Sequence, residues 1–185
     1  MADLMASEAG AGLPLKHGGC RLSLLADERR TLIAPFPGQA AAVSAALAAL
    51  GLSFPAPGQV ITAPGARIVW AGREQAMMSG AAPPVALDSH AALSDQGDGW
   101  AGFMLAGTGG VWGAEAVLAR LVPIDLRAGV FPPGRSARSF LGHLPMLLVR
   151  DTADAFEIFT YRSMAQSAVH ELEEAMRAVA ARAAL

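Results

Sequence analysis

Residues 145–183 read PMLLVRDTADAFEIFTYRSMAQSAVHELEEAMRAVAARA, and they carry the strongest structural signal in the chain. This stretch predicts two strands, about Pro145–Arg150 and Ala155–Tyr161, paired around a polar turn. A helix follows, because apolar residues recur there every three or four positions. We expect Ser163 to cap that helix, since Gln166 three residues later completes a capping-box pattern. Its apolar stripe comprises Val169, Leu172, Met176, Val179 and Ala183.

The rest of the chain also mixes short strands with helices. We expect hairpins over 20–36 and 91–105, strands at 59–63, 67–70 and 75–79, and helices over 39–50 and 114–121. Hairpins rather than repeated crossovers favour an α+β fold with antiparallel sheets. The order hairpin, helix, strands occurs twice, which indicates two ferredoxin-like halves. We therefore expect an N-terminal arm over 1–18, one half over 19–86 and another over 87–185.

Composition narrows the class of function. The 185 residues include 14 Lys and Arg against 16 Asp and Glu, so no basic excess suggests a nucleic-acid partner. A single cysteine, Cys20, excludes an internal disulfide and a cysteine-cluster zinc site. Charged residues make up 16% of the chain, against roughly 25% in typical soluble domains. That deficit favours a subunit covered by partners, although enrichment in alanine explains it nearly as well.

No segment is expected to enter a membrane. The longest apolar stretch, residues 39–54, is mainly alanine and is shorter than the roughly 20 residues a bilayer requires. The first ten residues carry Asp3 and Glu8 and lack the basic region of a secretory signal. We therefore expect a cytoplasmic protein.

The glycine-rich segment Gly107–Gly113 is a weak nucleotide-binding signal. It follows an expected strand and opens an expected helix. However, Trp112 occupies the position where a dinucleotide fingerprint needs its third glycine. We expect a tight structural turn instead.

The other candidate side chains do not assemble into an active site by sequence spacing. His170 pairs with Glu174 or lies on a solvated helix face, and His143 contacts a partner or is structural. Glu173 and Glu174 face different directions and form no dyad, and Cys20 is expected to be buried. The arginines either clamp an anion or are neutralised by Asp151, Asp154 and Glu157; they are Arg135, Arg138, Arg150 and Arg162. We expect no catalytic, cofactor-binding or metal-binding residue in this chain.

Several segments, in order, resemble the gamma subunit of heterotetrameric sarcosine oxidase. They are LVPIDLR at 121–127, FPPG at 131–134, SAR at 136–138, LGH at 141–143, FEIF at 156–159, RSMA at 162–165 and HELEEA at 170–175. The resemblance spans about residues 117–176. A weaker similarity at 67–72 and 75–80 extends to aminomethyltransferase domains. There Ala76 replaces an aromatic residue, and Met77 and Met78 replace leucines.

This resemblance implies a fold like the folate-binding domain of aminomethyltransferases. It also implies a complex that oxidises sarcosine with O2 to glycine, giving H2O2 and formaldehyde or methylene-tetrahydrofolate. Alpha, beta and delta subunits would be the partners and would hold FAD, FMN, NAD, tetrahydrofolate and zinc. The chain itself would be a non-catalytic structural subunit, with its final helix and the loop Pro132–Gly134 as contact elements.

An alternative is a stand-alone folate-binding or one-carbon transfer protein. That function would need a large cavity and a carboxylate that contacts the pterin. The sequence offers Asp125 and Asp95 as candidates for this carboxylate.

Overall fold

The computed structural model describes residues 8–26, 28–108 and 110–185, and its strands form two antiparallel sheets. The larger has the order β1-β2-β8-β11-β10-β9, with bounds Leu15–His17, Cys20–Leu24, Trp100–Gly107, Ala155–Tyr161, Leu144–Thr152 and Ser136–Leu141. The smaller has the order β4-β5-β6-β3-β7, with bounds Val60–Ala63, Ala66–Gly72, Gln75–Gly80, Arg30–Pro35 and Ala91–Asp95. The helices are α1 (Ala40–Leu47), α2 (Ala114–Leu118) and α3 (Ala165–Ala183), with 3-10 turns η1 (Ala48–Leu50), η2 (Val85–Ser89) and η3 (Arg162–Met164).

The two sheets repeat one strand arrangement. In the smaller sheet, the sequence β3, α1, β5, β6, η2, β7 gives the neighbour order β5-β6-β3-β7. In the larger sheet, β8, α2, β10, β11 and α3 give β10-β11-β8-β2, with the fourth strand supplied from near the N-terminus. This is the βαββαβ arrangement in both cases, so the expected α+β fold with two ferredoxin-like halves is confirmed.

The two expected hairpins at 20–36 and 91–105 are wrong. β2 pairs with β1 and β8, whereas β3 pairs with β6 and β7. In the same way β7 belongs to the smaller sheet and β8 to the larger. The chain therefore changes sheet between β2 and β3 and again between β7 and β8, because these strands pair with long-range partners rather than with each other. Consequently, the strands of the smaller sheet lie within residues 30–95 and those of the larger sheet within 15–24 and 100–161, which differs from a division into 19–86 and 87–185.

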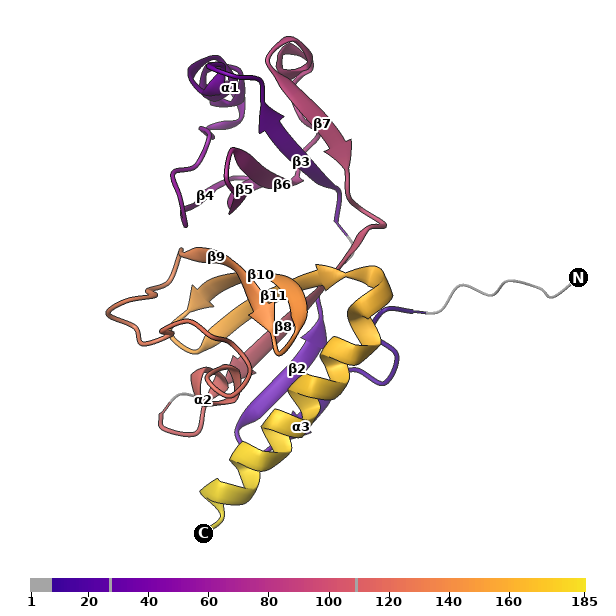
Figure 1. The fold of residues 1–185 in the computed structure, drawn as a ribbon, viewed down its shortest axis with the longest axis vertical. Coiled ribbons are helices and arrows are strands. Elements are labelled where there is room, and N and C mark those ends of the chain that lie inside the picture. The colour runs from indigo at the N-terminus through magenta and orange to yellow at the C-terminus, as the bar shows by residue number, and fades with distance from the viewer. Residues whose placement is uncertain (1–7, 27, 109) are drawn as a thin grey trace, which may run out of the picture.

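Helix α3 covers one face of the larger sheet, as Figure 1 shows in yellow, while the smaller sheet lies above the other face. Four residues of the expected stripe are buried, and only Ala183 at the helix end is exposed. The start differs from expectation, since Met164 is the N-cap and makes no side-chain cap bond. Ser163 lies inside η3 and cannot serve as that cap.

The remaining helices and strands agree with the sequence in type. Helix α1 and η1 occupy the expected helix over 39–50, which ends at Gly51 in the left-handed region with φ 70°. The expected strands at 59–80 are β4, β5 and β6, and the pairing of β10 with β11 is confirmed. No helix in the described part of the chain is long and apolar enough to cross a membrane.

Two strands were not expected, β1 within the arm and β9 at the open edge of the larger sheet. The part of the arm over 1–7 lies outside the described residues. β9 begins at a seam between the sheets, where Gln59 bridges Arg135. There Val60 donates its N–H to Gly134 O at 3.1 Å, and Ser136 donates to Gly58 O at 2.9 Å.

Candidate functional site

A cavity of about 430 Å³ lies between the two sheets. Val69 and Met77 of the smaller sheet and Leu147 and Phe159 of the larger sheet form its apolar surface. The rim comes from Leu25, Ala26, Glu28 and Arg30, from the β4–β5 hairpin and from the end of β6. Its volume lies in the range of about 300–1,000 Å³ that is usual for small-molecule sites.

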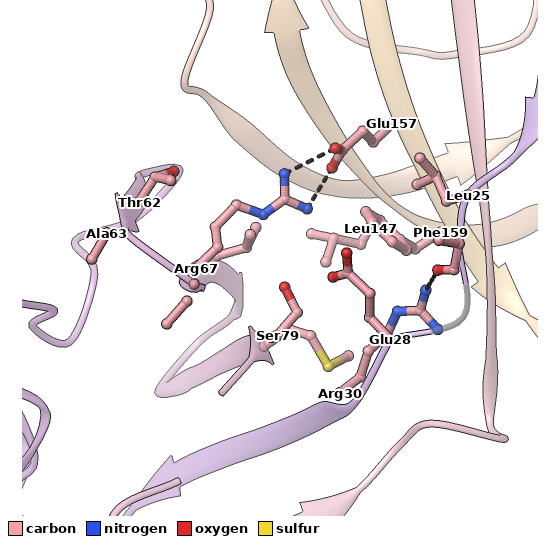
Figure 2. A pocket seen from close by; sticks show the side chains of 16 residues that line it. Leu25, Glu28, Arg30, Thr62, Ala63, Arg67, Ser79, Leu147, Glu157 and Phe159 are labelled. Carbon is pink, nitrogen blue, oxygen red and sulfur yellow. Dashed lines mark hydrogen bonds and ion pairs between the residues drawn. The ribbon is translucent and has the colours of Figure 1, made fainter. Parts of the chain in front are cut away.

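An ion pair between Arg67 and Glu157 spans the two sheets inside this cavity (Figure 2). Arg67 on β5 donates from both terminal nitrogens to the two carboxylate oxygens of Glu157 on β11, at 2.9 and 2.6 Å. Their side chains are 22% and 9% exposed. Burial acts to lower the pKa of Arg67, but hydrogen bonds and charge from Glu157 outweigh it, and the pKa is raised. The two hydrogen bonds of this ion pair therefore join the two sheets.

A second arginine, Arg30 on β3, lies on another side of the cavity (Figure 2). It is 4% exposed, and its guanidinium stacks 5.6 Å from the ring centroid of Phe159. It also donates to Ala26 O at 3.4 Å, and Glu28 lies nearby on the rim. The lining thus carries two arginines and two carboxylates between apolar surfaces. Ser79 is the hydroxyl-bearing residue at the end of β6 in this lining, and no histidine or cysteine is among the described residues that line the cavity.

The carboxylate of Asp154 occupies the glycine-rich turn. Asp154 Oδ1 accepts the backbone N–H of Glu115 at 3.2 Å, at the start of α2. A Cβ on Gly113 would lie 2.1 Å from Asp154 Oδ2, and one on Gly107 would lie 2.0 Å from it. The glycines therefore give Asp154 access to the helix start, where its negative charge disfavours a bound phosphate. The expectation of a structural turn fits this geometry.

The histidines do not come together. His170 is exposed on α3 and makes no hydrogen bond or ion pair with any described residue, while Glu174 pairs with Arg177 at 3.0 Å. His143 is exposed in the turn between β9 and β10, likewise without a polar partner among described residues. A histidine outside our candidates, His17 on β1, contacts Glu173 at 3.1 Å. That contact ties the N-terminal strand to α3.

Neither proposed aspartate lines the cavity. Asp125 forms an ion pair with Arg127 at the surface, and these hydrogen bonds lower its pKa from 3.8 to about 2. Asp95 ends β7 and accepts the N–H of Gly97 at 2.9 Å, as in an Asx-type turn. Both carboxylates are thus engaged in local structure.

The four C-terminal arginines form no anion clamp. Arg150 is 2% exposed and organises the loop before β9, donating to Leu126 O and Phe131 O at 2.6 and 2.9 Å. It also reaches Glu115 at 3.0 Å. Arg138 lies against aromatic rings instead, and Arg135 and Arg162 are exposed. These four side chains therefore do not share one anion-binding role.

Cys20 is buried, as expected, and burial together with the charge of Asp154 raises the pKa of its thiol. No three histidine, cysteine or acidic side chains gather as a metal site in the described residues. Cys20 therefore behaves as a small hydrophobic residue, in line with the sequence prediction.

Sequence reasoning missed the residues that define the cavity, namely Arg30, Arg67 and Glu157. Glu157 entered only as a neutraliser of nearby arginines, although its partner lies 90 positions away. The available signal was a charged residue inside an otherwise apolar strand, Phe156-Glu157-Ile158. Such a charge indicates a paired site, but only the fold identifies the partner.

No family model matches this chain, and no curated protein does. Among solved structures, it is similar to a chain of heterotetrameric sarcosine oxidase from Corynebacterium sp. U-96, determined in complex with pyrrole 2-carboxylate. The TM-score is 0.74 at 23% identity, over 93% of this chain and 89% of that one. The regulatory subunit of aspartate kinase from Thermus thermophilus covers 83% and 96% at 15% identity, but its TM-score of 0.38 supports no inference. The first likeness shows that the two chains share a fold over nearly their whole lengths.

Proposed function

We propose that this chain is a non-catalytic structural subunit, of the gamma type, in a heterotetrameric complex of the sarcosine oxidase kind. The observation that carries the proposal is the fold shared with a sarcosine oxidase chain over 93% of this chain and 89% of that one. A match that covers both chains almost completely favours the same role for the whole polypeptide. The ordered segments at 117–176, which resemble the gamma subunit, support the same choice.

The arrangement of side chains supports a structural role. The candidate histidines are exposed and separate, Asp154 fills the glycine-rich turn, and Arg150 serves the loop before β9. The described residues contain no nucleophile with an adjacent base and no metal-ligand cluster. On this proposal, alpha, beta and delta subunits carry FAD, FMN, NAD, tetrahydrofolate and zinc and perform the oxidation.

Co-expression tests the proposal. This chain, tagged, is co-expressed with the products of its neighbouring genes, and the purified material is assayed for sarcosine-dependent O2 consumption. We expect a stoichiometric, flavin-coloured complex. The His170→Ala substitution should change its turnover by no more than a few fold. Purification of the tagged chain without the other subunits would overturn the proposal. A loss of several orders of magnitude in kcat for the assembled His170→Ala complex would overturn its non-catalytic part.

A second candidate function is folate binding by this chain alone, and the cavity between the sheets favours it. At about 430 Å³ the cavity has room for a fused heterocycle, and it contains the Glu157 carboxylate. That carboxylate is already bound to Arg67, so a pterin would have to share it or displace Arg67. Glu157 therefore replaces Asp125 and Asp95 as the residue to test.

Calorimetric titration of the isolated chain with tetrahydrofolate tests this alternative. Folate binding predicts saturable binding that Glu157→Gln weakens at least tenfold. Asp125→Asn is a matched control on a surface carboxylate and should leave the affinity unchanged. No heat of binding at millimolar tetrahydrofolate would exclude the alternative.

A further inference from the structure

We propose that the open edge of β9, with the aromatic side chains beside it, binds an extended segment of another subunit as an additional strand. This proposal rests on the proposed function, because it names where the complex contacts this chain. The incoming segment would carry an acidic side chain near Arg138 and an apolar one near Phe140. Such strand addition is a common way for one chain to recognise another.

The backbone of β9 supplies the first argument. β9 pairs with β10 on one side and is the last strand of the larger sheet. On its other side Ser136 donates to Gly58 O at 2.9 Å, at the seam with the smaller sheet. Because backbone groups alternate along a strand, the N–H groups of Arg138 and Phe140 point to that same open side. Beyond the seam, no described residue accepts these two N–H groups.

The side chains next to this edge supply the second argument. Arg138 and Phe140 lie on the face of the sheet that carries Leu147 and Phe159, opposite α3. Phe140 is 51% exposed, and Tyr161 on the same face is 37% exposed. Trp100 packs against Tyr161, with ring centroids 5.0 Å apart. Aromatic residues and arginine are the types that carry most of the binding energy at protein interfaces.

The positive charge of Arg138 indicates that the partner segment carries a negative charge. Its guanidinium lies 4.7 Å from the Trp100 ring centroid and donates to the Tyr161 hydroxyl at 3.1 Å. The side chain is exposed and pairs with no described carboxylate. Held in this position by two rings, it is ready to bind an acidic residue on an incoming strand. A second copy of this chain fits less well, because symmetric pairing of two β9 strands centred on Arg138 would bring two Arg138 side chains together and would supply no acidic partner.

Two other edge strands, β1 and β7, are protected in ways that β9 is not. β1 has only three residues, including Lys16, and its His17 is tied to Glu173. β7 ends in the exposed polar pair Ser94 and Asp95. Short length and edge charges are the usual defences against strand addition. β9 instead presents an exposed phenylalanine beside its free N–H groups.

Two variants of β9 test the backbone and the charge separately, in the co-expressed complex. Phe140→Pro removes an N–H that no described strand of this chain uses, and Arg138→Glu reverses the charge at the neighbouring position on the same face. Val85→Asp, at a residue that is 83% exposed on η2 beside the smaller sheet, is the control. Each variant is first checked alone by near-UV circular dichroism and thermal unfolding.

We expect Phe140→Pro and Arg138→Glu to reduce incorporation into the complex at least tenfold, while Val85→Asp assembles like the unmodified chain. Should Phe140→Pro unfold the chain, the comparison of Arg138→Glu with Val85→Asp decides. Normal incorporation of the folded β9 variants would overturn this proposal and leave the proposed function intact. Loss of a homodimer of the isolated chain in these variants would identify a second copy as occupant and also overturn it. Failure of the unmodified chain to join the complex would overturn both proposals.

Discussion

The two sheets of this protein share a strand order but differ in how they are covered. The larger sheet buries one face under the 19-residue α3, which contributes Leu172 and Met176 to a core containing Phe103 and Phe156. The smaller sheet has the eight-residue α1, which buries only Val43 and Leu47 in a smaller core. The same topology therefore supports one sheet with a large core and another that has a small core and forms one wall of the cavity between the sheets.

This difference in core size implies that the two sheets contribute unequally to stability. Because apolar burial is the dominant favourable term in folding, most of the stability should reside in the larger sheet with α3. The facing surfaces of the sheets share a third cluster, including Val69, Trp100 and Leu147. The Arg67–Glu157 pair lies beside that cluster. Substitutions in the two regions should therefore differ in how much they change stability. The following predictions run from the largest effect to the smallest.

Leu172→Asp should destabilise the protein most, by more than about 4 kcal/mol, and prevent recovery of folded chain. Leu172 is 0% exposed beneath α3, so the substitution buries an unpaired charge. Ser167→Asp places the same charge on the exposed side of the same helix and should unfold like the unmodified chain. Urea unfolding measures both. A cooperative, near-normal transition for Leu172→Asp would show that α3 is not the main cover of the larger sheet.

Arg150→Met should cost about 3–5 kcal/mol, because it leaves Glu115 and several carbonyl oxygens without their buried donor. The loop before β9 should loosen, which hydrogen exchange at Phe131 would detect. Arg135→Met removes an exposed arginine from the same region and should change stability by less than about 0.5 kcal/mol. Equal effects of the two substitutions would contradict the assigned role of Arg150.

The ion pair between the sheets should show a coupling energy of about 1–2 kcal/mol in a double-mutant cycle of Arg67→Met and Glu157→Gln. Each single change leaves its partner partly buried and unpaired, whereas the double change removes both charges. Urea unfolding of all four proteins gives the coupling. Strict additivity would mean that the pair does not hold the smaller sheet to the larger.

Gly113→Ala should cost about 1 kcal/mol in the unmodified chain, because the new methyl group meets the end of the Asp154 side chain. Asp154→Ala alone should cost about 1 kcal/mol through loss of the cap on α2. In the double variant the methyl group has space, so Gly113→Ala should add little to the cost of Asp154→Ala. Thermal unfolding that shows additive losses would break the assignment of the glycine-rich turn.

The smallest effect is electrostatic and local. Asp125 should titrate at about 2 by NMR, below its ordinary value of 3.8, and Arg127→Met should return it toward that value. Since the folded pKa is depressed, the ion pair contributes fully above pH 3.8, and its contribution is lost as pH falls through about 2. A titration near 3.8 in the unmodified chain would show that the pair does not persist in solution.

Local patterns were readable from the sequence, whereas long-range pairing was not. The α3 stripe and the β10–β11 hairpin depend on neighbouring residues and were predicted with their correct types. The hairpins at 20–36 and 91–105 failed because alternation shows that a strand exists but not which sheet takes it. The Ser163 cap failed because η3 intervenes before α3, a local choice that the capping pattern does not encode.

The candidate site depended on the same long-range information. Arg67 and Glu157 meet only because β5 and β11 belong to sheets that face one another. Sequence spacing instead favoured residues with close neighbours, such as Asp125, which proved to be paired within its own loop. A charged residue in an apolar strand was visible, but its partner could not be chosen among 14 lysines and arginines.

Size-exclusion chromatography with light scattering tests the central claim most directly, on this chain alone and co-expressed with the proteins encoded by its neighbouring genes, the proposed sources of the alpha, beta and delta subunits. We predict that the co-expressed chain joins one flavin-coloured, sarcosine-oxidising complex with one copy of each subunit. A stable, colourless monomer that elutes apart from those subunits would contradict it.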